Sequence, residues 1–368
     1  MITDADVLAA VAAHEHDARE AMQFVHAHPE LGHEERRCSR FLTDMLMKKG
    51  LDVELCAGGM ETAFTATVTG TRAGRNVGIV CLYDAVSTIR PGGEVEAVHS
   101  CGHGVIAGSV VAAVLALADH RDQLAGSVTI VGCPADEIHA HGTVQEGGGK
   151  ALSVEAGLWE GIDVALYSHP EFIDTVSLAS RWMRRERVQL SGARSLTGEL
   201  EAPLLAAQRI IAANARDTMV EHLELDGDVE DGTSLALQAD MLIFADTEDE
   251  LDARASAARA VVPEGTWTSG LTYRGVQPND GVTAAVRESF AAAGRGFEPN
   301  PPALPFATDF GNISHAVPSA LIGVGREGGW AFHTDEGRDQ FLSEDGYDAA
   351  ITTAKVLALS AARLTEPA

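Results

Sequence analysis

The chain has 368 residues, enough for two domains, and its 45% hydrophobic and 22% charged residues are typical of a globular protein. Its formal net charge of −27 would repel nucleic-acid phosphates and anionic membrane surfaces, so we expect neither as a partner. No apolar stretch is long enough to span a bilayer, and the first residues lack the basic flank of a signal peptide, so we predict a cytoplasmic protein.

Short apolar runs and helical patterns alternate through the first half of the chain. Thr3 is a candidate N-cap for one helix over residues 4–27, which Pro29 follows. The remaining predicted helices are 36–50, 103–120 and 150–161, and the predicted strands are 64–70, 76–84, 127–137, 163–170 and 175–180. Strands that alternate with helices predict a doubly wound, mostly parallel α/β sheet.

A different order of elements begins near residue 185. The expected elements are a strand at 184–192, a helix at 200–216, strands at 219–226 and 233–245, a helix at 248–262 and a strand at 266–275. This β-α-β-β-α-β order is the ferredoxin-like pattern. The first style then resumes, so we predict a catalytic domain of residues 1–184 and 279–368 with an inserted domain at 185–278.

Asp84, Asp136, Glu137 and His169 lie where predicted strands end, and Cys101 and His103 lie at the start of a predicted helix. Ligands of open α/β sheets bind beyond the carboxyl ends of the strands. The candidate ligands are Cys101, His103, Glu137, His169 and His333. Thiolate, imidazole and carboxylate suit zinc, manganese or cobalt, without selecting among them. Five donors exceed the needs of one structural zinc, so they favour two divalent ions that share a ligand and leave a position open for water.

Several stretches together resemble a known superfamily. They are HPELGHEE, LYDA, HSCGHGVIAG, CPADE, GGGKALSVEAGLWEGIDVALYSHP, TDFGNISHAVPS and AFHTDE. In this order they resemble the aminoacylase-type metallopeptidases, in particular the amidohydrolase branch that includes the indole-acetyl-amino-acid and aminobenzoyl-glutamate hydrolases. The resemblance spans nearly the whole chain and includes the inserted domain, which in such proteins is a lid.

The resemblance implies a role for each matching residue. Cys101 corresponds to a bridging thiolate, and His103, Glu137, His169 and His333 to the other metal ligands. Asp136 corresponds to the general base, which takes a proton from the attacking water and passes it to the leaving nitrogen. The resemblance also implies a homodimer formed through the lid.

The sequence departs from the family pattern at the base and in the lid. The family usually has glutamate where Asp136 stands, so either the shorter side chain is misplaced or the backbone compensates. A lid histidine that helps polarise the scissile carbonyl is absent, and Leu196 occupies its place. An extra stretch after Glu137 brings His139 and His141, of which one supplies the missing donor or both belong to an exposed loop.

Other positions are candidates for supporting roles. Gly104 stands where relatives carry Asp or Asn, which alters the surroundings of the ligands. Asp84 either orients a histidine ligand or is an ordinary acid at a strand end. Asp309, Asn312 and His315 match a family stretch that lines the site, although turn chemistry also explains them.

Three functions are consistent with these residues. The leading prediction is a metal-dependent hydrolase that cleaves the amide C–N bond of a small N-acyl or N-aryl amino acid. The alternative is an aminohydrolase that releases ammonia from an activated arylamine, since this reaction needs no lid histidine. The third is a non-catalytic metal-binding protein, against which the retention of all five ligand types speaks.

Overall fold

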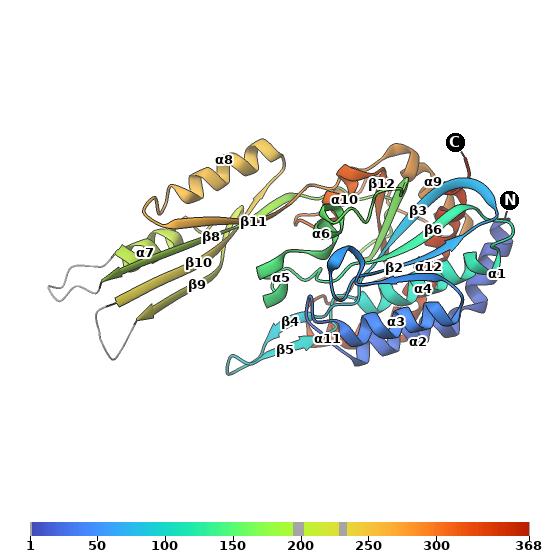
Figure 1. The fold of residues 1–368 in the computed structure, drawn as a ribbon, viewed down its shortest axis with the longest axis horizontal. Coiled ribbons are helices and arrows are strands. Elements are labelled where there is room, and N and C mark those ends of the chain that lie inside the picture. The colour runs from blue at the N-terminus through green and yellow to red at the C-terminus, as the bar shows by residue number, and fades with distance from the viewer. Residues whose placement is uncertain (1, 194–201, 228–233, 368) are drawn as a thin grey trace. The chain divides into compact units, whose positions relative to one another are not determined.

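The structure is a computed structural model that describes residues 2–193, 202–227 and 234–367 (Figure 1). The chain divides into two compact units. Unit 1 comprises Met1–Ala179, Val276–Ala303 and Asp309–Ala368, and unit 2 comprises Ser180–Gly275 and Leu304–Thr308. The sequence-based division assigns residues 185–278 to the second domain and does not include 304–308. No helix in the described ranges is long and apolar enough to cross a membrane.

A six-stranded sheet forms the centre of unit 1, in the order β1-β2-β6-β3-β7-β12. Its strands are β1 (Asp52–Leu55), β2 (Phe64–Thr69), β3 (Arg72–Cys81), β6 (Ala125–Gly132), β7 (Val164–Glu171) and β12 (Ser319–Gly325). The pairs β6/β3, β3/β7 and β7/β12 are parallel, whereas β1/β2 and β2/β6 are antiparallel. The predicted mixed α/β class with a mostly parallel sheet is therefore confirmed.

Helices α4 and α12 pack against each other and against this sheet (Figure 1). The helices of unit 1 are α1 (Asp4–Ala13), α2 (Glu15–Ala27), α3 (Arg36–Lys48), α4 (His103–Asp119), α5 (His141–Glu146), α6 (Gly149–Glu155), α9 (Asp280–Ala292), α10 (Phe310–Ala316), α11 (Asp335–Phe341) and α12 (Glu344–Leu364). The first fifteen residues of α4, His103 to Leu117, are all buried. A helix that is apolar on every side belongs inside a protein, and this one carries a candidate ligand at its first residue.

Two predictions about local structure are wrong. Residues 4–27 form two helices rather than one, because the backbone leaves the helical conformation at His14, whose ring bridges the carboxylates of Asp17 and Asp119 at 2.7 and 2.8 Å. Residues 175–180 form no named strand. Thr175 instead makes isolated bridges, to Gly323 and Glu298.

Several short elements were not predicted from the sequence. They are β1, α5, α10, α11, the 3₁₀ turn at Ala57–Gly59 and the antiparallel hairpin of β4 (Val86–Ile89) and β5 (Val95–Val98). None is long enough to show a clear hydrophobic period.

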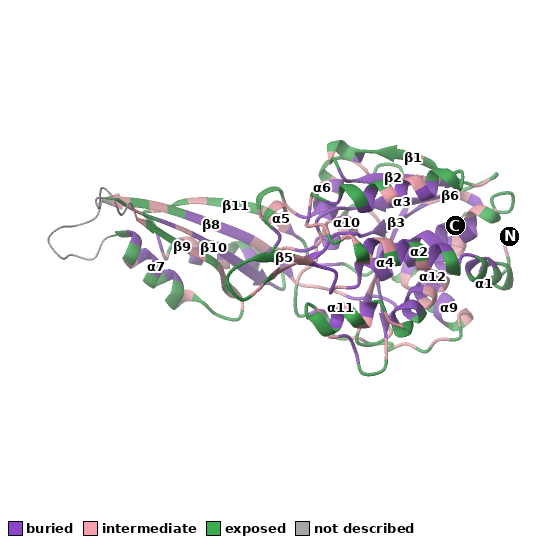
Figure 2. Cartoon of the chain, turned by 90° about the horizontal axis from the view of Figure 1, so that it is seen from below, coloured by how far each residue is buried: buried purple, intermediate pink, exposed green. Residues whose placement is uncertain are grey.

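Unit 2 holds a four-stranded antiparallel sheet in the order β11-β8-β10-β9. Its elements along the chain are β8 (Trp182–Ala193), α7 (Ala202–Ala213), β9 (Thr218–Gly227), β10 (Ser234–Ala245), α8 (Glu248–Arg259) and β11 (Thr266–Tyr273). Its own core includes Val188, Ile210, Met241, Ile243 and Leu251. Figure 2 shows buried residues along β8 and β10, the two middle strands of this sheet.

Candidate metal centre

Three neighbouring parallel strands of unit 1 end at the candidate site. Asp84 follows β3, Asp136 and Glu137 follow β6, and His169 lies near the end of β7. In the sheet these strands stand side by side in the order β6-β3-β7. The carboxyl ends of parallel strands meet at one edge, which is why side chains far apart in sequence come together here.

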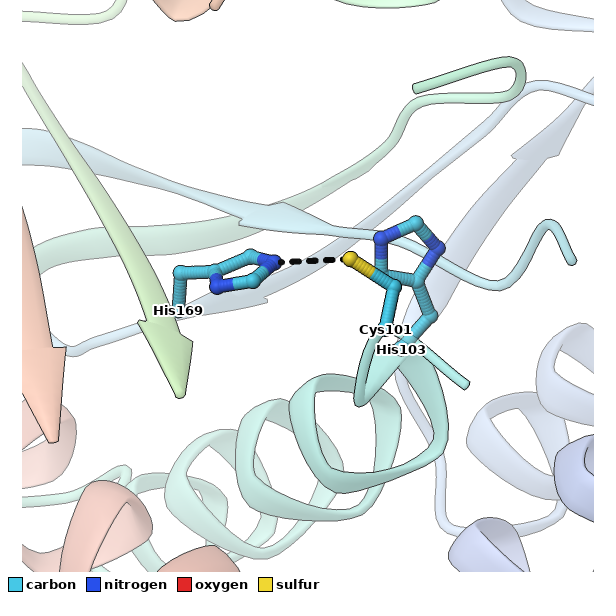
Figure 3. Close-up of side chains that lie close together, drawn as sticks. All are labelled: Cys101, His103 and His169. Carbon is cyan, nitrogen blue, oxygen red and sulfur yellow. Dashed lines mark hydrogen bonds between the residues drawn. The ribbon is translucent and has the colours of Figure 1, made fainter. Parts of the chain in front are cut away.

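Cys101 lies among the candidate ligands. Its Sγ is 3.6 Å from Nε2 of His169 and 3.3 Å from Nε2 of His333. Figure 3 shows the sulfur between the His169 ring and the start of α4, where His103 stands. The ligand atoms form two groups, each within 4.8 Å: Cys101, His103 and His169, and Cys101, Glu137 and His333. Cys101 belongs to both groups, as a ligand shared by two ions must.

A tight turn places Cys101 and His103. Gly102, between them, has a φ of +89°, and an added Cβ would lie 2.7 Å from Pro170 and 2.9 Å from Phe341. Both the conformation and the space therefore require glycine. His333 is tied to the same turn, since its N–H donates to the carbonyl of Ser100 at 2.9 Å.

Hydrogen bonds orient two of the histidine rings in the same way. Nδ1 of His103 lies 2.8 Å from the carbonyl oxygen of Asp84, and Nδ1 of His169 lies 2.7 Å from that of Pro170. A carbonyl oxygen only accepts, so in each ring Nδ1 carries a proton, and Nε2 is the nitrogen that faces the other candidate donors. Oδ1 of Asp84 also lies 2.8 Å from Nδ1 of His103, and Oδ2 of Asp84 accepts the N–H of Glu137 at 2.9 Å.

Two of the five candidate donor atoms lack a hydrogen-bond partner within the described residues. Nε2 of His103 and Oε1 of Glu137 are buried, and within the described ranges neither has a hydrogen-bond partner. They lie 3.7 Å apart. An unpaired buried polar atom costs free energy, which a cation between such atoms would recover. With one thiol, three imidazoles and one carboxylate, this donor set fits a pair of divalent ions.

The protonation of the site is consistent with this fit. Burial and the Glu137 carboxylate raise the pKa of the Cys101 thiol well above its usual range. Burial acts to lower the pKa of His103, but the carboxylates of Asp84 and Asp136 raise it well above its usual range. Burial and the neighbouring His103 lower the pKa of His169 to about 4. Two of the donors therefore hold protons that a cation would displace.

Asp136 is held by a residue that the sequence analysis did not single out. Lys150 has a fully buried side chain, and its Nζ bonds to Oδ1 of Asp136 and lies 2.8 Å from Oδ1 of Asp309. Oδ2 of Asp136 lies 3.3 Å from Nε2 of His103. Although burial acts in the opposite direction, Lys150 and His103 hold the pKa of Asp136 well below its usual range. Lysine at the start of a short helix is usually exposed, so no sequence signal marks this burial.

A second buried residue, Glu35, shapes the loop that carries both acids. Its Oε1 accepts the N–H of Ala135 at 2.8 Å, and its Oε2 accepts the hydroxyl of Thr62 at 2.7 Å. Ala135, directly before Asp136, has a φ of +57°, which is uncommon for a residue other than glycine. The backbone before the short acid is thus in an unusual conformation that Glu35 stabilises.

The other predicted site residues lie as follows. His139 and His141 are exposed, the latter as the first residue of α5, and in the described part of the chain neither belongs to the two ligand groups. Asn312 and His315 lie in α10, which begins after Asp309. Leu196 lies outside the described residues.

Gly104 has a packing reason. An added Cβ there would lie 3.2 Å from the carbonyl oxygen of Met22 in α2. The close approach of α2 to the first turn of α4 therefore leaves little room for a side chain at this position.

Known proteins share this fold. A Bacillus subtilis protein described as a dinuclear metal-binding peptidase of the M20 family superposes with a TM-score of 0.68, at 18% identity, over 96% of this chain and 99% of its own. An aminobenzoyl-glutamate utilization protein from Klebsiella pneumoniae superposes with a TM-score of 0.64, at 15% identity, over 95% and 97%.

Sequence comparisons identify the family. Xaa-Arg dipeptidase of Mus musculus is 25% identical over 374 residues, which cover 90% of this chain and 82% of the relative. A p-aminobenzoyl-glutamate hydrolase component of Escherichia coli (strain K12) is 29% identical over 161 residues, or 39% of this chain and 30% of the relative. The model of peptidase family M20/M25/M40 matches residues 83–360, which confirms the resemblance seen in the motifs. The chain belongs to this peptidase family and is a hydrolase of C–N bonds.

Proposed function

We propose that the protein hydrolyses the amide C–N bond of a small N-acyl or N-aryl amino acid. The observation that carries the proposal is the convergence of Cys101, His169 and His333 at 3.3 to 3.6 Å beside the acid pair. The family match supports it, as do relatives described as an Xaa-Arg dipeptidase, an N-acetyl-L-cysteine deacetylase and a p-aminobenzoyl-glutamate hydrolase.

Two divalent ions, zinc, manganese or cobalt, are part of this proposal. Cys101 would bridge them, His103 and His169 would complete one ligand group, and Glu137 and His333 the other. Such ions polarise a carbonyl oxygen and lower the pKa of water to near 7.

Asp136 would act as the general base. Its ion pair with Lys150 keeps it ionised, so it is ready to accept a proton at Oδ2, the oxygen that faces His103. Because the same pair keeps its pKa low, Asp136 would hold that proton weakly and release it to the leaving nitrogen.

Unit 2 would serve as a ferredoxin-like lid and dimerisation domain. Its order of elements, β-α-β-β-α-β, and its sheet order support this assignment. Exposed apolar side chains on α7 and on the edge strand β9 support a homodimer through this unit: Leu204, Ile211, Met219 and Leu225. A cytoplasmic location stays a prediction from the sequence.

The test is a substrate panel assayed with the metal-loaded protein. N-acetyl amino acids, dipeptides, p-aminobenzoyl-glutamate and simple arylamines are offered, and free amino acid and ammonia are measured separately. We expect release of the amino acid. Release of ammonia alone, from arylamines, would identify an aminohydrolase instead, and no turnover with two ions bound would identify a non-catalytic metal-binding protein.

Asp136→Asn is the matched variant for this test. It keeps the size of the side chain and removes the proton acceptor, so we expect kcat to fall roughly 10²- to 10⁴-fold. Its metal content should equal that of the wild type, because Asp136 is in neither ligand group. An Asp136→Asn protein with unchanged kcat would exclude Asp136 as the base.

A further inference from the structure

Lys150 is a buried cation, and its role in keeping Asp136 ionised does not by itself explain why it is held in a fixed position. Its side chain has no exposed surface, and it stands near the start of α6, a helix of seven residues. A buried ammonium is costly unless ionic partners surround it, and a buried ion pair is often no more stabilising than apolar residues of the same size. Stability is therefore a weak reason for a lysine here.

Asp309 fixes Lys150 at both its backbone and its side chain. Oδ2 of Asp309 accepts the backbone N–H groups of Lys150 and Ala151 at 2.9 and 3.0 Å, and Oδ1 lies 2.8 Å from Nζ. Nζ also lies 5.2 Å from the centre of the Tyr167 ring. Asp309 therefore binds both the backbone at the start of α6 and the ammonium group of Lys150, which fixes the position of the lysine side chain.

Lys150 binds one carboxylate oxygen of Asp136. Nζ bonds to Oδ1, while Oδ2 remains on the side of His103, 3.3 Å from Nε2. Of the rotamers open to a free aspartate, this arrangement selects one. A misplacement of about 1 Å can cost a catalytic group roughly 100-fold in rate, so a fixed position matters for a base.

We propose that Lys150, fixed by Asp309, is a positioning residue that holds Asp136 with Oδ2 directed to the site. The inference rests on the proposed function, in which Asp136 is the base. Lys150 does not touch substrate and acts only through Asp136.

A double-mutant cycle tests this dependence. Lys150→Met keeps the length of the side chain and removes the charge, and we expect it to lower kcat about 100-fold with little change in KM. In the Asp136→Asn background the same substitution should change kcat by less than about three-fold, because the group it positions is already lost. Lys48→Met, on the exposed end of α3, is the control and should keep wild-type kinetics.

Equal losses in both backgrounds, or no loss in either, would overturn the proposal. Circular dichroism and metal content verify that each variant is folded and loaded. If Lys150→Met does not fold, Asp309→Asn replaces it in the same cycle. The asparagine amide removes the negative charge that faces Nζ of Lys150 and so weakens its fixation.

Crystal structures of the variants separate this proposal from the proposed function. In Lys150→Met or Asp309→Asn the Asp136 carboxylate should leave its wild-type position, whether or not a substrate is known. An unchanged Asp136 would refute the positioning role, whereas a displaced Asp136 in a protein that cleaves no amide would refute only the proposed function.

Discussion

Glu35 is a carboxyl group whose burial links folding to pH. Its side chain is fully buried, and burial together with the nearby Asp84 raises its pKa to about 8 from an ordinary value of 4.5. The folded protein therefore binds this proton more tightly than the unfolded chain does. The resulting stabilisation is fully present below about pH 4.5 and is lost as the pH rises to about 8.

Glu35→Gln should remove this dependence. The amide oxygen can still accept from the N–H groups of Ala135 and His33, and its N–H₂ can face Thr62. Urea unfolding of the metal-free proteins between pH 5 and 8 should show the wild type losing stability relative to the variant, on the order of a few kcal/mol. Parallel stability curves would show that Glu35 does not titrate in this range.

The types of the residues predicted the candidate site, whereas the burial of individual residues could not be predicted. Cysteine, histidine and glutamate at two predicted strand ends, at the start of a predicted helix and in the stretch AFHTDE indicated the five candidate ligands. Few other roles combine these side chains. Lys150 and Glu35 gave no such signal, since charged residues are ordinarily exposed and only the folded chain shows them to be buried. The unusual φ of Ala135 was equally hidden, because alanine rarely adopts it.

The elements of unit 1 bring the candidate ligands together from distant parts of the sequence. Gly102 ends one loop and starts α4, so Cys101 and His103 flank a turn that only glycine allows. The alternation of strands and helices predicted the sheet edge where the acids lie. The break at His14 was not predictable from local pattern, since the residue that its ring contacts, Asp119, is more than a hundred residues away in the chain.

The apolar surface of unit 2 leads to a prediction about assembly. Ile211 on α7 is 61% exposed and Met219 on β9 is 45% exposed. If these side chains lie in a homodimer interface, the double substitution Ile211→Lys/Met219→Lys should yield monomers of 38.7 kDa, because two lysines per protomer would be buried without partners. Light scattering after gel filtration measures the mass.

The hairpin of unit 1 supplies the control for this experiment. Ile89 on β4 is 75% exposed, so Ile89→Lys alters a comparable apolar side chain outside unit 2. This variant should remain dimeric. A monomeric wild type, or a dimer that survives both unit 2 substitutions, would contradict the proposed interface.

Binding of metal ions to the protein should release protons. The pKa of Cys101 and that of His103 both lie well above their usual ranges, so at pH 7 each group is protonated before loading. His169, with a pKa of about 4, is already neutral. We expect loading of both ions to release about two protons per chain.

Calorimetric titration in buffers with different ionisation heats measures this number. A heat of binding that does not vary with the buffer would show that the donors are already deprotonated.

The metal content of the purified protein decides whether the two ligand groups bind a pair of ions. Elemental analysis should find about two divalent ions per chain in the wild type, because the donors form two groups that share Cys101. Cys101→Ala should lose most of this metal, whereas Cys56→Ala, which alters an exposed cysteine, should keep it. A wild type without bound ions, or a Cys101→Ala protein that retains both, would contradict a two-ion centre that shares Cys101.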